Sequence, residues 1–168
     1  MDAKTGTVPD PGPRPSPGDA RTLRLTRIFD APRALVFKAW TDPAMVVRWM
    51  GPRTHPAALY QNDPRPGGTW RCALRPVDGS PDIGQSGVYR EVVTNRKLVL
   101  SFNWDPGPNA HWTAGHETLV TVELFDHGEG QTRMEFQQEF LISQEHAQGH
   151  NRGWTGSFER LDELLRAI

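Results

Sequence analysis

The sequence lacks the cysteines that would staple a small fold or hold a metal through thiolates. Cys72 is the only cysteine among 168 residues, which excludes an internal disulfide and a zinc site built from several cysteines. Because Cys72 lies within a predicted strand, we interpret it as a small buried core residue. The fold must therefore be stable without disulfide bonds, and the chain is long enough for one domain to bury a sufficient core.

A charge excess and long apolar runs are also missing. Nineteen basic residues nearly balance twenty acidic ones, for a formal net charge of −1, so no overall field favours nucleic acid or an anionic membrane as a partner. No apolar stretch approaches the roughly 20 residues of a membrane span, and the N-terminus has no charged segment followed by an apolar one. We therefore predict a soluble, cytoplasmic protein with no nucleic-acid and no membrane partner.

Signatures of catalysis and of nucleotide binding are absent as well. Gly84-Gln85-Ser86-Gly87 lacks the spacing of a Gly-x-Ser-x-Gly nucleophile elbow, and Gly67-Gly68 is typical of a hairpin turn. His146 and His150 stand four residues apart, a spacing that can bind a metal, but no carboxylate motif accompanies them and we interpret them as solvated helix residues. We predict no cofactor and no metal, and we favour a binding protein over an enzyme.

Proline and glycine, by contrast, are plentiful, and they gather at the N-terminus. Prolines alternate with other residues through residues 9–17 without any apolar periodicity, so this stretch cannot form a packed element. A proline-rich docking peptide is an alternative. We predict a disordered tail over residues 1–20 and one domain over residues 21–168.

The predicted domain begins with one strand and two short helices. Apolar and basic residues alternate from Thr22 to Phe29, as in a half-buried strand. Asp30 and Asp42, each followed within two residues by proline, predict the starts of two helices, and Gly51-Pro52 predicts the end of the second. Six further strand segments, separated by turn signals, are predicted near residues 54–61, 68–76, 83–93, 97–104, 117–126 and 131–140.

A long C-terminal helix predicts how these elements pack. Ser143 is a candidate N-cap, and apolar residues then recur every three or four positions up to Leu165. In the last strand Met134, Phe136, Gln138 and Phe140 share one face, with charged or polar neighbours on the other. Both apolar surfaces are buried only if the helix lies across the sheet. We predict an α+β fold: a curved antiparallel sheet of about six to seven strands gripping one long helix, with two short helices after the first strand.

Aromatic rings on the predicted inner face are the main functional signal. Periodicity alone favours rings that fill the core, but large rings also pack imperfectly and can leave a pocket. The direction of Tyr89 is open because both faces of its strand are apolar. The loop over residues 105–116 is either a lid over such a pocket or a flexible surface connection. The candidate ligand-binding residues are Trp70, Tyr89, Phe102, Trp104, Trp112, Phe136, Gln138, Trp154 and Phe158.

Several segments resemble a known family. They are Arg27–Pro32 with Val36–Pro43, Arg48–Pro52, Arg65–Arg71 and Gly87–Val93, together with Gly153-Trp154 in the final helix. Over about residues 22–167 the chain resembles the START-like helix-grip superfamily (SRPBCC), specifically bacterial homologues of the heat-shock chaperone ATPase activator C-terminal domain. The resemblance implies a cavity between helix and sheet. It covers hydrophobic-ligand carriers, polyketide cyclases, self-resistance proteins and co-chaperones, so the fold alone selects no function.

We predict that the chain binds a small hydrophobic or aromatic molecule in this cavity, as a carrier, a sequestering protein or a sensor. One alternative is a polyketide cyclase- or hydrolase-like enzyme that uses the same cavity, with His116 and Glu117 as the named acid–base candidates. Another is a co-chaperone-like domain, which would need an exposed apolar patch for its protein partner. A homodimer formed through Trp112 or a sheet edge is a further hypothesis.

Overall fold

The computed structural model describes residues 21–168, so the predicted tail over residues 1–20 lies outside the described residues. The elements follow the predicted order. They are β1 (Leu23–Phe29), α1 (Arg33–Thr41), α2 (Pro43–Trp49), β2 (Ala57–Asn62), β3 (Thr69–Leu74), β4 (Ile83–Val93), β5 (Lys97–Trp104), β6 (Thr118–Asp126), β7 (Thr132–Glu139) and α3 (Gln144–Ala167).

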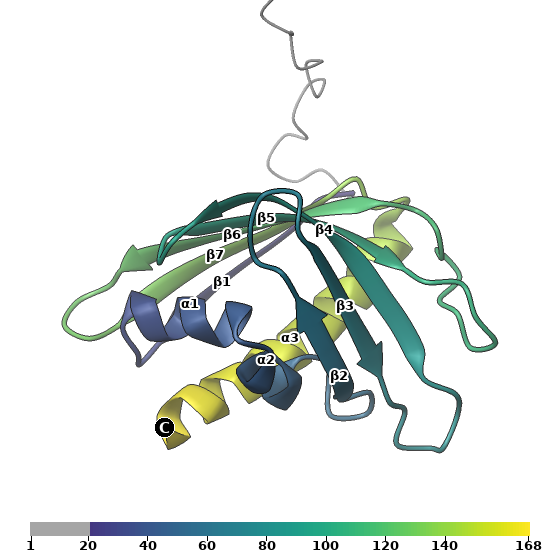
Figure 1. Ribbon diagram of the computed structural model, residues 1–168, viewed down its shortest axis with the longest axis horizontal. Coiled ribbons are helices and arrows are strands. Elements are labelled where there is room, and N and C mark those ends of the chain that lie inside the picture. The colour runs from purple at the N-terminus through teal and green to yellow at the C-terminus, as the bar shows by residue number, and fades with distance from the viewer. Residues whose placement is uncertain (1–20) are drawn as a thin grey trace, which may run out of the picture.

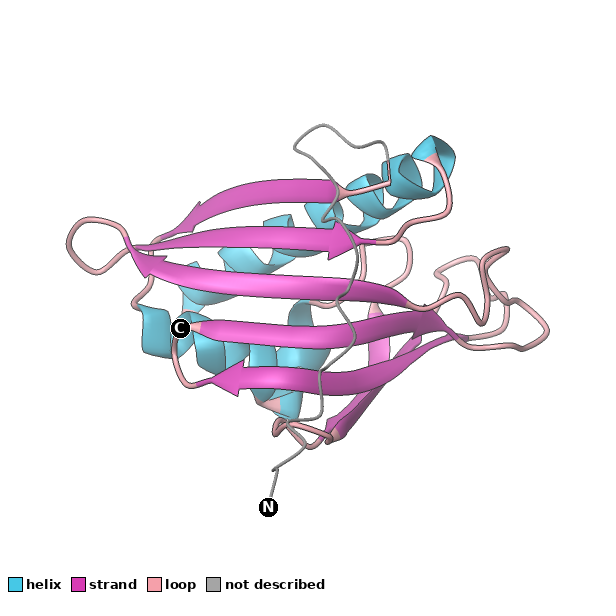
Figure 2. Cartoon of the chain, turned by 90° about the horizontal axis from the view of Figure 1, so that it is seen from above, coloured by secondary structure: helices cyan, strands magenta, loops and turns pink. Residues whose placement is uncertain are grey.

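One curved, antiparallel sheet holds all seven described strands, in the order β1-β7-β6-β5-β4-β3-β2. The long helix α3 crosses beneath its concave side, beside the short helices α1 and α2 (Figure 1). Seen from above, the strands lie in front and the helices behind them (Figure 2). This arrangement confirms the predicted α+β fold. No helix within residues 21–168 is long and apolar enough to cross a membrane.

Local signals explain where the helices begin. The Asp42 carboxylate accepts the backbone N–H of Ala44 at 3.0 Å, and the Ser143 hydroxyl accepts that of His146 at 3.2 Å. Both are N-caps, as predicted, and each satisfies an N–H that has no partner within the helix. The prediction for Asp30 was wrong: α1 begins after Pro32, which provides no side-chain cap.

Two irregularities decide which strand residues face the core. The register between β4 and β5 shifts between Tyr89 and Glu91, so the two side chains do not share a face as strict alternation would require. Tyr89 is buried, and Glu91 forms a surface ion pair with Lys97 at 3.3 Å. The buried position predicted for Phe140 was wrong, since β7 ends at Glu139 and Phe140, with φ +68, turns its ring toward solvent.

An aromatic cluster forms the centre of the core, between α3, α1 and the sheet. Trp40 meets Trp49 edge-on at 4.8 Å between ring centroids, and Phe136 lies 4.7 Å from Trp154. The Trp49 indole N–H donates to the Ala39 carbonyl oxygen at 2.8 Å, so this buried polar group is satisfied. Such rings contribute roughly 1.5–3 kcal/mol each on burial, and they hold α3 against the strands.

Replacement of Gly87 by alanine is expected to disrupt the sheet where β4 passes Trp70. An added Cβ would overlap the Ser101 carbonyl oxygen and would lie 2.5 Å from Trp70 Nε1. Overpacking of this kind typically costs about 1–3 kcal/mol, so urea unfolding of Gly87→Ala should show that loss. Gly107→Ala is the matched control because its Cβ would meet nothing within 4 Å. Equal stability of the two variants would contradict this packing.

Candidate ligand-binding pocket

A pocket of about 230 Å³ lies between α3 and the concave side of the sheet. Its walls come from the segment after α2, from β3, β4 and β5, from the loop after β5, and from α3. A dry cavity of about 150 Å³ accommodates benzene, so this pocket has room for one or two fused rings. The lining residues include Met50, Gly51, Pro52, His55, Leu74, Ile83, Gln85, Phe102, Trp104, His111, Gly149, His150, Gly153, Trp154 and Ser157.

Small residues on α3 leave this space open. Gly149, Gly153 and Ser157 follow one another at intervals of four, so they share one face of the helix. A Cβ added at Gly153 would meet no atom of the surrounding structure within 4 Å. The pocket therefore exists partly because this face of α3 carries almost no side chains.

Gln85 is the polar side chain on the wall that stands out. It is only 6% exposed, yet its Oε1 atom has no hydrogen-bond partner within residues 21–168. A buried carbonyl oxygen left in this way costs about 1–3 kcal/mol. A ligand with an O–H or N–H group could satisfy it.

Gln138 lies behind the wall and holds two of the wall residues in place. Its Oε1 accepts from His150 Nδ1 at 2.8 Å and from Trp154 Nε1 at 2.9 Å, and its Nε2 donates to the Thr118 hydroxyl at 2.9 Å. Trp104 Nε1 donates to His150 Nε2 at 3.1 Å. Because the ring accepts at Nε2, His150 is the neutral tautomer with its hydrogen on Nδ1, and both of its nitrogens are occupied.

A cluster of imidazoles continues from His150 toward the loop after β5. His146 lies 4.6 Å from His150 and 5.7 Å from His111 between ring centroids. His146 Nδ1 accepts the Ile142 N–H, and Thr113 links its Nε2 to His111 Nδ1. No group of three or more His, Cys, Asp or Glu side chains in residues 21–168 could hold a metal ion.

The solvated position predicted for His146 and His150 was wrong. They are 2% and 5% exposed, respectively. Burial lowers the pKa of His150 to about 3, with repulsion from His146 and His111 as the smaller cause. Burial, followed by repulsion from His111 and His116, lowers the pKa of His146 to about 4. The spacing of four places both rings on one face of α3, as predicted, but that face is buried.

The loop over residues 105–116 packs against the domain and contributes to the pocket. The His111 ring stacks on Trp104 at 4.6 Å and 11° and lines the pocket, while Thr113 is buried. The Gly115 N–H donates to the Trp104 carbonyl oxygen at 3.0 Å. The loop is therefore placed where a lid would be, and its movement stays a prediction.

The nine candidate ligand-binding residues are distributed over three environments. Phe102, Trp104 and Trp154 line the pocket, and their contact with a ligand stays a prediction. The side chains that lie in the core or behind the wall are Trp70, Tyr89, Phe136, Gln138 and Phe158. Trp112 is 59% exposed on the loop.

The sequence reasoning missed several wall residues, of which Gln85 and the small-residue face of α3 matter most. Gln85 precedes the buried Tyr89 by four residues in the same strand, so alternation from Tyr89 would have placed it inward. The interval of four between Gly149, Gly153 and Ser157 was visible in the sequence too.

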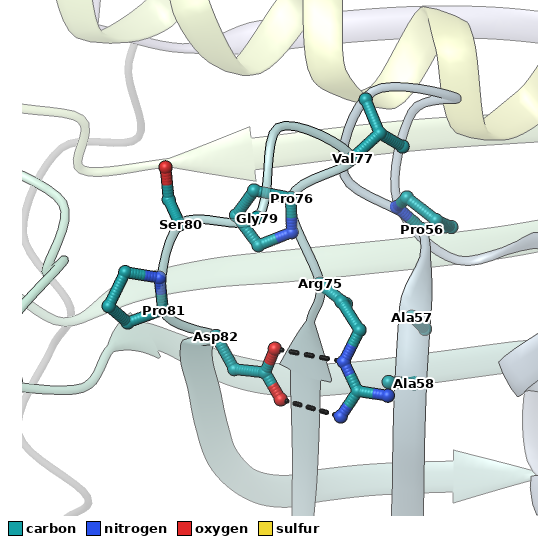
Figure 3. Close-up of a pocket in the computed structure, with 10 residues that line it drawn as sticks. All are labelled: Pro56, Ala57, Ala58, Arg75, Pro76, Val77, Gly79, Ser80, Pro81 and Asp82. Carbon is teal, nitrogen blue, oxygen red and sulfur yellow. Dashed lines mark hydrogen bonds and ion pairs between the residues drawn. The ribbon is translucent and has the colours of Figure 1, made fainter.

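A second hollow, of about 790 Å³, lies outside the grip of α3, beside β2 and the β3–β4 turn (Figure 3). It is shallow and open to solvent, and Arg75 and Asp82 form a two-armed ion pair across it, at 3.1 and 3.0 Å. No buried side-chain polar atom without a partner is found among its lining residues. The smaller pocket beneath the sheet, which carries the unpaired Gln85 oxygen on its wall, is the better candidate site.

Comparisons with known proteins agree with the fold. The family model described as "Activator of Hsp90 ATPase homolog 1-like protein" matches residues 30–166. A search of curated proteins found no match. Among solved structures, a protein from Rhodobacter sphaeroides superposes with a TM-score of 0.75 at 24% identity, over 90% of this chain and 97% of that one.

Two further solved structures are similar to the same extent. The AHSA1 protein from Silicibacter pomeroyi gives a TM-score of 0.75 at 23% identity, over 87% of this chain and 98% of that one. A protein from Arthrobacter aurescens gives 0.76 at 24% identity, over 89% and 88%. At these identities the likeness shows the fold.

The buried histidines predict a specific dependence of stability on pH. Their folded-state pKa values, about 3 for His150 and about 4 for His146, lie below the ordinary value of 6.5. As the pH falls below 6.5, the histidines become protonated in the unfolded chain but stay neutral in the folded chain. Their contribution to the free energy of unfolding is therefore fully present above pH 6.5 and is lost as the pH falls toward 4. Each histidine contributes a slope of about 1.4 kcal/mol per pH unit.

Urea unfolding between pH 4.5 and 8 measures this effect. His150→Leu should flatten the profile by about that slope, because one of the histidines with a lowered pKa is removed. Gln148→Leu, on the solvent-exposed side of the same helix, should keep the wild-type profile. Identical profiles for wild type and His150→Leu would contradict a neutral, buried His150.

Proposed function

Because the chain belongs to the Activator of Hsp90 ATPase homolog 1-like family and has a helix-grip fold, we propose that it binds a small hydrophobic or aromatic molecule between α3 and the sheet. The pocket of about 230 Å³ supports this. Its volume suits a ligand of one or two rings. Carrying, sequestering and sensing are all compatible with such binding.

The unpaired, buried Oε1 atom of Gln85 is the observation that supports the proposal most. A core that served packing alone would gain nothing from a buried amide oxygen without a partner. A ligand hydroxyl or ring N–H would satisfy it, while Phe102, Trp104 and Trp154 would supply apolar surface for the rings. We therefore propose an aromatic ligand with one hydrogen-bond donor near Gln85.

Binding is better supported than acid–base catalysis in the same pocket. His150 lines the pocket, but both of its nitrogens are hydrogen bonded and its pKa of about 3 makes it a weak base. His116 instead contacts the Phe140 carbonyl oxygen, and Glu117 pairs with Arg90 at the surface. Neither is among the residues that line the pocket.

A protein-binding role would need a different surface. Trp112, Phe140 and Ile142 are exposed apolar side chains, and all three are near the imidazole cluster: the Trp112 ring lies 5.5 Å from that of His146. Single exposed apolar residues are common on monomeric proteins. The co-chaperone-like function and the homodimer stay predictions.

Filling the pocket from α3 tests the proposed function. Gly153→Leu places a side chain in the open space beside the helix, and leucine favours the helix over glycine by up to about 1 kcal/mol, so the variant should fold. With 2-naphthol as the probe, wild type should gain melting temperature and show saturable heat in calorimetry. Gly153→Leu should lose at least about tenfold in affinity.

Gln148→Leu adds the same side chain to the exposed side of α3 and should bind 2-naphthol as wild type does. Absence of binding to wild type, or equal binding by wild type and Gly153→Leu, would exclude this pocket as the site for such a molecule.

The contact with Gln85 has its own test. Gln85→Leu removes the amide but keeps the side chain large and buried, so binding of 2-naphthol should weaken by about two- to tenfold, the equivalent of one hydrogen bond. Naphthalene, which has no hydroxyl, should bind both proteins alike. A parallel change for both probes would mean that Gln85 shapes the pocket without bonding to the ligand.

A further inference from the structure

A much smaller void, of about 10 Å³, lies deeper in the core. Trp40, Tyr60 and Tyr89 are on its wall, and Met50, Phe102 and Trp154 line both this void and the larger pocket. The two spaces are thus separated by the thickness of a few side chains. A volume near 10 Å³ is about the least that holds one water-sized group.

Trp40 brings an unused hydrogen-bond donor to this void. Its side chain is 3% exposed, and its Nε1 has no hydrogen-bond partner within residues 21–168. The neighbouring indoles differ in this respect. Trp49 Nε1 donates to the Ala39 carbonyl oxygen, and Trp70 Nε1 donates to the Ser101 carbonyl oxygen.

The tyrosine pair brings a second donor. The Tyr60 and Tyr89 oxygens lie 3.3 Å apart, and Asn62 Nδ2 donates to Tyr89 at 3.0 Å. Only one of the two hydroxyl hydrogens can be used in the bond between the tyrosines. Within residues 21–168, neither hydroxyl has another group to which it donates. One hydroxyl hydrogen is left over, whichever tyrosine carries it.

Both tyrosines keep their hydrogens at neutral pH. Burial, followed by the neighbouring Tyr89, raises the pKa of Tyr60 well above its usual value, and burial raises the pKa of Tyr89. Residues that line the void thus carry two unused donors, an indole N–H on Trp40 and a phenol O–H on the tyrosine pair.

We propose that this void is the inner end of the ligand site and takes a carbonyl oxygen, so that the preferred ligand is an aryl ketone whose rings fill the larger pocket. The proposal rests on the proposed function. The two donors match the two lone pairs of one carbonyl oxygen. With the Gln85 oxygen on the wall of the larger pocket, the ligand carries a donor at one end and an acceptor at the other.

Met50 is the flexible side chain between the two spaces. It follows α2 as the C-cap residue and is buried against both walls. Its unbranched thioether side chain has three rotatable bonds and adapts to irregular gaps more readily than the rings of Phe102 and Trp154. Rotation of Met50 lets the carbonyl pass while the rings keep their positions.

The test compares 2-naphthol with 6-acetyl-2-naphthol, which adds a carbonyl at the far end of the same rings. Wild type should bind the acetyl compound about two- to tenfold more tightly. Trp40→Phe removes the N–H and keeps an aromatic ring, so it should abolish that advantage and leave 2-naphthol unchanged. The infrared carbonyl stretch of the bound acetyl group should lie at lower frequency in wild type than in Trp40→Phe.

Two further variants guard against a folding defect. The double variant Tyr60→Phe with Tyr89→Phe removes both hydroxyl hydrogens and should reduce the acetyl advantage in the same way. Gln148→Leu, on the exposed side of α3, should affect neither probe.

The outcomes separate this inference from the proposed function. If 2-naphthol binds and Gly153→Leu blocks it, but the acetyl group adds no affinity and neither Trp40→Phe nor the double tyrosine variant changes anything, the carbonyl site is wrong and the pocket stands. If neither probe binds wild type, both proposals fail. A gain in affinity that persists in both variants, without a shift of the carbonyl stretch, would also overturn the carbonyl site.

Discussion

The hydrogen bonds of one buried amide determine how the long helix sits on the sheet. Gln138 lies fully buried on β7, where an unpaired amide would cost about 1–3 kcal/mol for each unmet group. Its partners His150 and Trp154 stand four residues apart on α3, so satisfying Gln138 fixes the rotation of the helix about its own axis. The same rotation directs Gly149 and Gly153, each one residue before these partners, toward the pocket.

This dependence also limits the chemistry of the pocket. His150 would be the natural proton-transfer group, but its Nδ1 hydrogen is engaged by Gln138 and its Nε2 by Trp104. Taking up a proton would require His150 to give up the Trp104 bond in a buried, uncharged setting that already lowers its pKa to about 3. The histidine therefore works as a structural link between β5, β7 and α3. Among the lining residues of this pocket, Gln85 carries the buried polar atom that has no partner, beside the aromatic rings of Phe102, Trp104 and Trp154.

Periodicity predicted those parts of the structure in which one face is consistently apolar. The alternation around Phe136 and Gln138 predicted both the buried face of β7 and the need for partners of the amide. It could not predict where alternation breaks. The register shift after Tyr89 and the left-handed backbone at Phe140 each reverse the direction of a side chain, and neither has a glycine to announce it.

The candidate site was less predictable than the fold because a pocket forms where side chains are small or absent. Eight of the nine predicted residues were aromatic side chains and one was the polar Gln138, and the structure packs several of the rings tightly against one another. The open space comes instead from glycines on α3, whose role appears only when the helix is placed on the sheet. His150 could have been placed correctly from the sequence. It stands four residues before Trp154, and this interval predicts that both side chains lie on the same buried face of the helix.

In the proposed site, unmatched polar atoms on the two sides of one wall of side chains would select the ligand. Gln85 leaves an acceptor unpaired, whereas Trp40 and the tyrosine pair leave donors unpaired at a void behind the same wall. Net stability of a domain is only about 5–15 kcal/mol, and each such atom costs about 1–3 kcal/mol, so apolar replacements at these positions would stabilise the empty protein. A ligand with complementary ends removes these costs on binding, and a molecule without them binds with the costs still in place. The proposed site would therefore favour one orientation of an aryl ketone, a preference that apolar burial alone would not provide.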